Sequence, residues 1–148
     1  MDEELKAISK ESKALFKLGR GGHALKLLEP YAYKYTNNAK YLDLLAKAFT
    51  SQGEYEKARS CLMQMMNITK NKNIAYGAML NLAIGMTHSE KYDKAMELFN
   101  NFLKKEFELH ICHAFMAICQ LKLKNNIEAE NHIAQAIALS KEIKNHKH

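Results

Sequence analysis

Four short segments of this chain resemble one another, and this internal repetition restricts the possible folds more than any other feature of the sequence. The segments read GRGGHALKLL, GEYEKARSCL, EKYDKAMELF and KNNIEAENHI. Each contains an alanine at its sixth position, and the intervals between these alanines are 34, 37 and 34 residues: Ala24, Ala58, Ala95 and Ala129. Repetition with such a period is typical of solenoid proteins, in which each structural repeat packs against its sequence neighbours.

Apolar residues recur with helical spacing before and after each alanine. Apolar-periodic helices are predicted upstream of the alanines, over residues 8–18, 42–49, 79–86 and 116–123. Downstream, the apolar residues continue four and seven positions after each alanine. The turns between the paired helices contain Gly19, Gly53, Glu90 or Lys124. With only six glycines and one proline in 148 residues, the sequence predicts an all-α chain of about eight helices in four pairs.

Two local features interrupt the regular repeat. Pro30 falls inside the second helix of the first pair, where it removes a backbone N–H and clashes with the preceding turn. We therefore expect that helix to kink or restart near Glu29. The interval between Ala58 and Ala95 is three residues longer than the others, and we assign the excess to a longer connection over the polar run 67–73.

The two central segments carry a pattern that resembles the tetratricopeptide repeat (TPR) family, whose units are helix–turn–helix repeats of 34 residues. The second segment combines Leu42, Leu45-Ala46, Phe49, Gly53, Tyr55, Ala58 and Leu62. The third combines Met79, Leu82-Ala83, Met86, Tyr92, Ala95 and Phe99. The outer repeats match less well, since Glu11-Ser12 replace the apolar-small pair of the first and the fourth lacks both the Gly and the Tyr. Such deviation is expected of terminal repeats, which meet water on one face.

The resemblance spans about residues 5–143 and implies a TPR-like α-solenoid with a concave groove. We expect a single domain over 1–148, with repeats at approximately 5–37, 38–72, 73–107 and 108–144 and a polar tail at 145–148. In the family, the first helix of every pair lines the groove. Carried over to this chain, the expected peptide-groove residues are Lys13, Lys47, Leu80, Asn81, Ile84, Phe115, Ile118 and Leu121. This lining changes from basic to apolar, so we expect a partner peptide with some acidic residues and several apolar anchors.

The resemblance implies a non-enzymatic protein–protein interaction module, acting as a scaffold or chaperone. The best-known TPR subclass holds the terminal carboxylate of a heat-shock chaperone, but the groove residues here retain only one Lys and one Asn of that clamp, so this co-chaperone activity is disfavoured. Residues 117–140 are similar to the last repeat of the small TPR chaperones of type III secretion systems. The characteristic N-terminal extension of those chaperones is missing.

The predicted first helix of the fourth pair is apolar on nearly every side. Its apolar residues are Ile111, Cys112, Phe115, Met116, Ile118, Cys119, Leu121 and Leu123. A helix with one side in water is normally polar on that side, so something is expected to cover it: a ligand, a second subunit or a folded-back terminus. The alternative function is therefore a homo-oligomeric structural subunit that assembles through the apolar fourth repeat.

The net charge of +6 is compatible with nucleic acid, an anionic membrane or an acidic protein as partner. Nucleic acid is disfavoured because only Arg20 and Arg59 offer the planar fork that suits phosphates and base edges. The N-terminus has no apolar leader and no stretch is long enough to span a bilayer, which makes the cytoplasm the expected location.

No catalytic motif is present, and neither a cofactor nor a metal is expected. The glycines at 19, 21 and 22 lack the Lys-Ser/Thr ending of a phosphate-binding loop. His110, Cys112 and His113 share one helical turn, but Cys112 points away from the face of the two histidines, so a structural role is favoured over zinc binding. The three cysteines cannot all pair within one chain and are expected to be reduced and buried.

Overall fold

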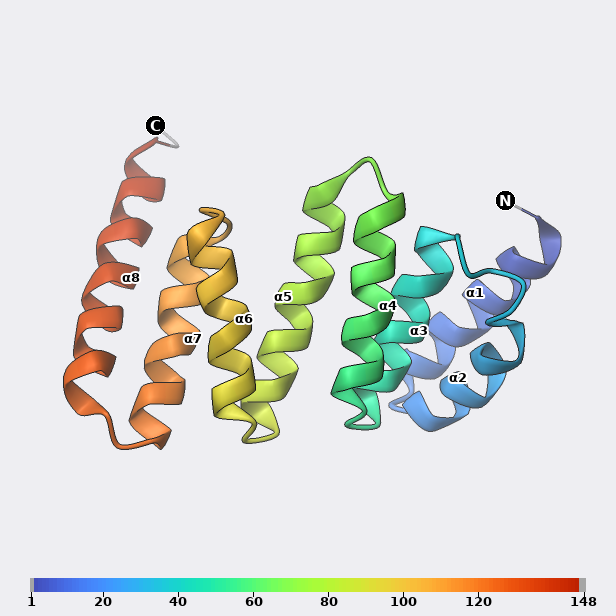
Figure 1. Ribbon diagram of the computed structural model, residues 1–148, viewed down its shortest axis with the longest axis horizontal. Coiled ribbons are helices and arrows are strands. Elements are labelled where there is room, and N and C mark those ends of the chain that lie inside the picture. Colours follow the sequence, from blue (N-terminus) through green and yellow to red (C-terminus); the bar gives the residue numbers. More distant parts are fainter. Residues whose placement is uncertain (1, 147–148) are drawn as a thin grey trace. The chain divides into compact units, whose positions relative to one another are not determined.

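The computed structural model describes residues 2–146, and within them the chain is built from helices with no strand (Figure 1). The prediction of an all-α protein is thus confirmed. The α-helices are α1 (Glu3–Lys17), α2 (Gly21–Leu28), α3 (Ala39–Ser51), α4 (Tyr55–Ile68), α5 (Lys72–His88), α6 (Tyr92–Lys104), α7 (Leu109–Lys122) and α8 (Asn126–His146). A short 3-10 helix, η1 (Glu29–Tyr31), follows α2.

The turns inside the four predicted helix pairs share one backbone conformation. In each turn one residue has a positive φ, of 71° at Gly19, 75° at Gly53, 64° at Glu90 and 65° at Lys124. The N–H of the following residue then donates to the carbonyl five positions earlier: Arg20 to Leu15, Glu54 to Phe49, Lys91 to Met86 and Asn125 to Gln120, at 2.8–2.9 Å. This is the Schellman ending of a helix. The repetition seen in the sequence is therefore also a repetition of backbone geometry, including the two turns that lack glycine.

The chain divides into two compact units, Met1–Leu82 and Ala83–His148. In the first unit α2 packs against both α1 and α3, and α3 packs against α4. In the second unit α7 packs against both α6 and α8. The repeat alanines, two in each unit, are completely shielded from solvent: Ala24, Ala58, Ala95 and Ala129 are 0% exposed. A methyl side chain at these positions allows neighbouring helices to approach closely.

The core of the first unit includes polar groups that are satisfied within it. The Tyr41 hydroxyl donates a 2.5 Å hydrogen bond to the Leu28 carbonyl, and burial raises the pKa of Tyr41 to about 12. Ser12, which occupies the small-residue position of the first repeat, is buried and donates to the Ser9 carbonyl at 3.0 Å. The serine that weakens the sequence match in this repeat is therefore accommodated by a local hydrogen bond.

The two interruptions of the repeat have different outcomes. The prediction at Pro30 is confirmed, because α2 ends at Leu28 and Pro30 lies in the first turn of η1. The prediction of a longer connection over 67–73 is wrong. Only residues 69–71 are non-helical there, and the extra residues lengthen α5 to 17 residues, compared with 13 in α3.

At the C-terminal end, α8 continues through His146. The last two residues of the polar tail predicted at 145–148 lie outside the described residues. In the part of the chain that the structure describes, none of the helices combines the length and the apolar character needed to cross a bilayer.

Candidate functional site

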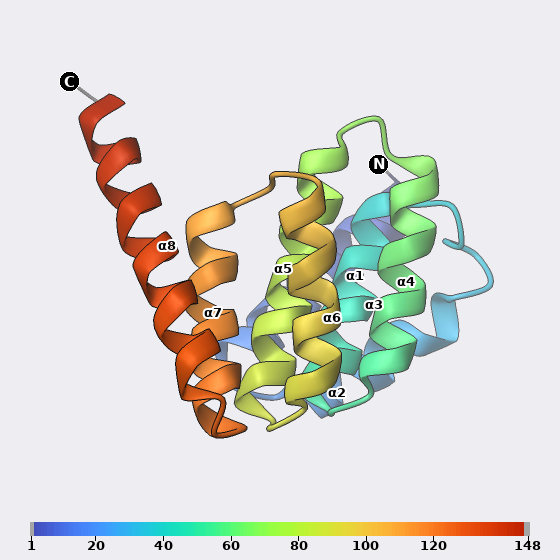
Figure 2. The same ribbon diagram turned by 60° about the vertical axis from the view of Figure 1, so that its left-hand side comes forward.

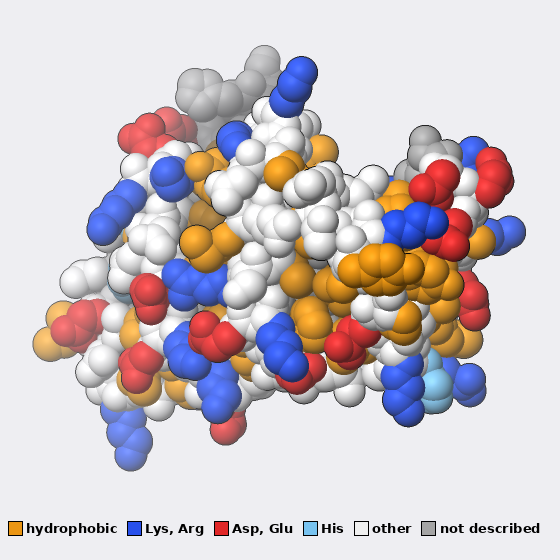
Figure 3. Space-filling view, turned by 45° about the vertical axis from the view of Figure 1, so that its right-hand side comes forward, with side chains coloured by type: hydrophobic (Ala, Val, Ile, Leu, Met, Phe, Trp, Pro, Cys, Tyr) orange, Lys and Arg blue, Asp and Glu red, His pale blue; other side chains and the backbone are white. Residues whose placement is uncertain are grey.

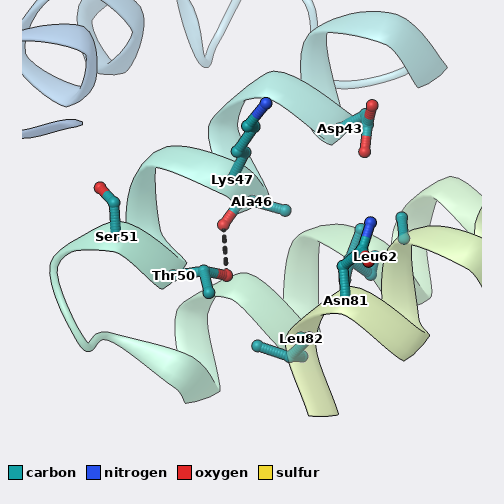
Figure 4. A pocket seen from close by; sticks show the side chains of 9 residues that line it. Asp43, Ala46, Lys47, Thr50, Ser51, Leu62, Asn81 and Leu82 are labelled. Atoms are coloured by element: carbon teal, nitrogen blue, oxygen red, sulfur yellow. Dashed lines mark hydrogen bonds between the residues drawn. The ribbon is translucent and has the colours of Figure 1, made fainter. Parts of the chain in front are cut away.

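A pocket of about 400 Å³ opens in the first unit, where α3 faces α4 and the middle of α5 (Figure 4). Its lining residues are Asp43, Ala46, Lys47, Thr50, Ser51, Leu62, Ala78, Asn81 and Leu82. Asp43, Lys47 and Thr50 share one side of α3 because they are spaced by four and three residues. The predicted groove residues Lys47 and Asn81 thus reach the same pocket from different helices.

The pocket has an apolar floor and a polar mouth. Ala46, Leu62 and Leu82 are buried, whereas Asp43 and Asn81 are exposed. The Thr50 hydroxyl is already engaged, since it donates to the Ala46 carbonyl at 2.8 Å (Figure 4). The Asn81 amide forms no hydrogen bond with any described residue, so both its N–H groups and its carbonyl are available to a ligand.

Two lysines and one carboxylate set the charge at the mouth of the pocket. Desolvation raises the pKa of Asp43, although the nearby positive charges of Lys47 and Lys13 oppose that shift. The Lys47 ammonium also lies 5.0 Å from the centre of the Phe16 ring in α1, within the range of a cation–π contact. Lys13, predicted for the groove, is therefore near enough to Asp43 to act on its charge, although it does not line the pocket, and the three charges sum to a net positive charge.

The predicted groove residues of the second unit form an aromatic and aliphatic surface on α7. The half-buried Phe115 ring stacks on Phe99 of α6, with centroids 5.8 Å apart and planes 12° apart. The edge of His88 meets the same ring at 6.3 Å and 90°. Ile118 and Leu121 follow on α7 and are 41% and 49% exposed. We call Phe115, Ile118 and Leu121 the α7 apolar surface.

The remaining predicted groove residues lie on α5. Leu80 is only 7% exposed, so it offers little surface to a ligand and contributes mainly to the core. Ile84 is half-buried. Sequence reasoning did not single out Thr50 and Ser51 as pocket residues. The signal for Thr50 was present, because it follows Lys47 by three positions and therefore lies on the same side of α3.

Cysteine and histidine side chains are placed within the packing of the helices. Cys112 and Cys119 are buried free thiols and Cys61 is a half-buried one. Burial raises the pKa of Cys112 to about 11 and also raises the pKa of Cys119, which keeps both in the less reactive protonated form. Among the described residues, no three His, Cys, Asp or Glu side chains are grouped so that they could hold a metal ion.

Two histidines instead contact each other between α7 and α8. The Nδ1 atoms of His113 and His132 are 3.0 Å apart, so one ring must donate its proton and the other must accept it. Desolvation lowers the pKa of both rings, and the mutual repulsion of the two charged forms lowers that of His113 further. This pair therefore favours the neutral state at physiological pH.

Charged side chains of both signs are mixed on the face of the molecule shown in Figure 3. Blue and red side chains are mixed there, and a continuous group of hydrophobic side chains lies in the right-hand part of the view. A protein that neutralises many phosphates needs a concentrated cationic surface. The face in Figure 3 shows no such concentrated cationic surface.

No family model and no curated protein matches this sequence, but several solved structures resemble its fold. A crystal structure of MamA superposes with a TM-score of 0.69 at 19% identity, covering 97% of this chain and 81% of the other. A second MamA crystal structure gives 0.70 at 19% identity, covering 97% and 75%. MamA 41-end from Desulfovibrio magneticus RS-1 gives 0.67 at 15% identity, covering 96% and 78%. Together with the helical architecture, this likeness confirms the TPR-like α-solenoid fold.

Proposed function

We propose that this chain is a protein–protein interaction scaffold that binds a peptide segment of a partner through its first-helix residues. The TPR-like fold supports the general role. The observation that carries the proposal is the exposed α7 apolar surface, because Ile118 and Leu121 remain accessible while the neighbouring Met116 and Cys119 are buried. Exposed apolar residues grouped on one surface are typical of sites that bind another protein.

The pocket between α3 and α5 suits a polar part of such a peptide. The Asn81 amide can both donate to and accept from a peptide group, which holds an extended backbone without selecting a side chain. Lys13 and Lys47 favour acidic side chains in that part of the ligand. Asp43 opposes additional negative charge within the pocket itself, so we expect the acidic residues to remain near the mouth.

The α7 apolar surface suits apolar anchor residues. An aliphatic or aromatic side chain placed against Phe115 and Ile118 would remove apolar area from water on both molecules, and full burial of one such side chain stabilises a complex by about 1.5–3 kcal/mol. A few anchors of this kind commonly supply most of the affinity of an interface. The ligand class proposed is therefore a peptide with apolar anchors and some acidic residues.

A secretion-type chaperone role is the narrower form of this proposal. It rests on the similarity of residues 117–140 to the last repeat of type III secretion chaperones. Such a chaperone would cover an apolar segment of another protein until that segment is delivered. The three unpaired cysteines favour work in the reducing environment of the cytoplasm.

A random peptide library selected against the immobilised chain tests the proposal without assuming a partner. We expect selected peptides to contain apolar anchors with acidic residues and to bind in a fluorescence anisotropy assay. The double exchange Ile84→Asp with Phe115→Asp should reduce affinity at least about tenfold, since it places charge at the anchor positions. Asn81→Ala should reduce it less, by the loss of one or two hydrogen bonds.

Ile127→Asp is the matched control for this experiment. Ile127 is an exposed isoleucine on α8, outside the pocket and the α7 apolar surface, so its exchange should leave peptide affinity unchanged. Helical circular dichroism should be retained by every variant. Undiminished peptide binding by the Ile84→Asp, Phe115→Asp chain would move the binding site to another surface.

The second candidate function is a homo-oligomeric subunit that uses the α7 apolar surface as its interface. The exposure of Ile118 and Leu121 supports it as well, because a second copy would cover them as a peptide would. The molecular mass in solution of the Phe115→Glu, Ile118→Glu chain distinguishes the two functions. An oligomer that this change dissociates favours assembly through α7.

A further inference from the structure

The longest helix, α8, carries a second exposed stripe that peptide binding at α7 does not use. Its residues follow one another at alternating intervals of four and three, the spacing of a coiled-coil seam: Asn126, Glu130, Ile133, Ile137, Ser140 and Lys144. All six are exposed, including Ile133 at 40% and Ile137 at 51%. We call these six residues the α8 stripe.

The α8 stripe is separate from the side of α8 that packs against α7. Ala129 and His132 lie on that packed side, where Ala129 is completely buried and His132 contacts His113. The last turns of α8 extend past the start of α7 (Figure 2). On the packed side, Leu139, Glu142 and Ile143 line a hollow against the start of α7, whereas residues 140–145 are all exposed. The two exposed isoleucines of the stripe, Ile133 and Ile137, leave water only if another surface covers them.

The charges of the stripe indicate which helix fits. Glu130 and Lys144 lie at equal distances before and after Ile137, one at each end of the apolar part. Neither forms an ion pair or side-chain hydrogen bond with a described residue. A second α8 laid antiparallel, with its Ile137 opposite the first Ile137, places each Glu130 opposite a Lys144. A parallel arrangement would instead place Glu130 opposite Glu130 and Lys144 opposite Lys144.

We propose that two copies of this chain form a dimer through antiparallel contact of their α8 stripes, with Ile137 on the twofold axis. Ser140 is then the stripe residue of the other copy that lies nearest to Ile133, one position from being directly opposite it, and two Glu130–Lys144 pairs close the ends of the seam. The seam from 130 to 144 is about 21 Å long. A contact in which both copies use the same surface is closed after two subunits, so the assembly ends at a dimer.

This dimer does not depend on the proposed peptide binding, because none of its residues belongs to the pocket or to the α7 apolar surface. Sedimentation equilibrium of the full chain over a range of concentrations should show reversible dimerisation. Ile137→Asp should weaken the dimer at least about tenfold, since both copies lose their central apolar contact. Ile127→Asp, on the same helix but outside the stripe, should leave dimerisation unchanged.

Reversing the end charges tests the antiparallel register. Glu130→Lys and Lys144→Glu should each weaken self-association by roughly three- to tenfold, since each change replaces two attractions by two repulsions. An equimolar mixture of the two variants should restore dimers of mixed composition, and so should a chain carrying both changes. The restoration should decline at high salt, which screens exposed charge pairs.

Three results would overturn the proposal. The first is a chain that stays monomeric at all concentrations, and the second is a dimer that Ile137→Asp leaves intact. The third is a mixture of the two charge variants that does not recover dimerisation. An oligomer dissociated by Ile118→Glu but not by Ile137→Asp would assign the interface to α7 instead. Circular dichroism confirms folding of each variant, which is expected because the exchanged side chains are exposed.

Discussion

Single residues at the turns show how the repeat is maintained where its sequence degenerates. Glu90 and Lys124 adopt the positive φ that Gly19 and Gly53 adopt in the other repeats. A side chain in this left-handed conformation costs about 1–2 kcal/mol, because its Cβ approaches the following carbonyl oxygen. The hydrogen bond that ends the helix is formed in all four turns, including the two in which glycine is missing.

Glycine at these two turns is therefore expected to stabilise the protein. Glu90→Gly and Lys124→Gly should each increase the free energy of unfolding by about 0.5–1 kcal/mol, the relieved strain exceeding the entropy that glycine loses. Urea denaturation followed by circular dichroism measures this. Gly53→Ala is the reverse control and should destabilise by about 1 kcal/mol, purely through backbone strain, because no atom lies within 4 Å of the added Cβ. A lower stability of Glu90→Gly would contradict the argument.

Gly21 serves a different purpose from the turn glycines. A Cβ added there would lie 2.0 Å from the Ser51 Oγ and 2.6 Å from the Ser51 Cβ, so α2 can approach the end of α3 only without a side chain. Gly21→Ala should lower the free energy of unfolding by about 1–3 kcal/mol, and Ser51→Gly should partly restore it. Gly22→Ala is the adjacent control, since its Cβ would meet only the flexible end of Gln52 at 3.3 Å. Equal effects of the two alanines in urea denaturation would exclude the steric explanation.

At the scale of elements, the contact of α7 with α8 includes a pair of groups that titrate near physiological pH. The pKa values of His113 and His132 are lowered in the folded protein, so the unfolded chain binds more protons than the folded chain around the ordinary histidine value of 6.5. The free energy of unfolding that these neutral histidines contribute is therefore present above pH 6.5 and is lost as the pH falls below it.

Thermal unfolding should consequently occur at lower temperature at about pH 5.5 than at about pH 7.5. The change should be smaller in a His132→Gln chain, because that chain lacks the half-buried His132 imidazole and the repulsion that it exerts on a protonated His113. Asp2, which caps α1, and Glu4 in its first turn also favour their charged form in the fold, but their pKa values are lowered from values near 4, so their contribution is lost at more acidic pH. An identical pH dependence in His132→Gln would exclude the histidine pair as its cause.

Element boundaries were predictable where the chemistry is local and uncertain where it is not. The end of α2 follows from Pro30, whose ring cannot continue a helix. The polar run at 67–73 has no such barrier, and its residues joined α4 and α5 because each additional helical residue gains a backbone hydrogen bond once a helix has formed. The polarity of residues 67–73 was therefore not sufficient to predict a long loop between α4 and α5.

At the scale of the molecule, the candidate site was predicted in part. Lys47 and Asn81 meet at one pocket, and Phe115, Ile118 and Leu121 form an accessible surface, whereas Leu80 is buried. The helix α5 is apolar on nearly all sides near Leu80, so periodicity did not distinguish its packed side from its open side. The pocket floor is a product of packing, since Leu62 of α4 and Leu82 of α5 approach α3 only in the folded chain.

The sequence by itself determined the helices, their pairing at four similar turns and the buried alanines, because helical periodicity, turn chemistry and side-chain size act within a few residues. The tertiary structure decided which apolar side chains remain in contact with water and which polar ones surround a pocket. Those properties depend on neighbours brought together by packing. That is why the α7 apolar surface, the pocket of Asp43, Lys47 and Asn81, and the exposed seam of α8 were defined only in the folded chain.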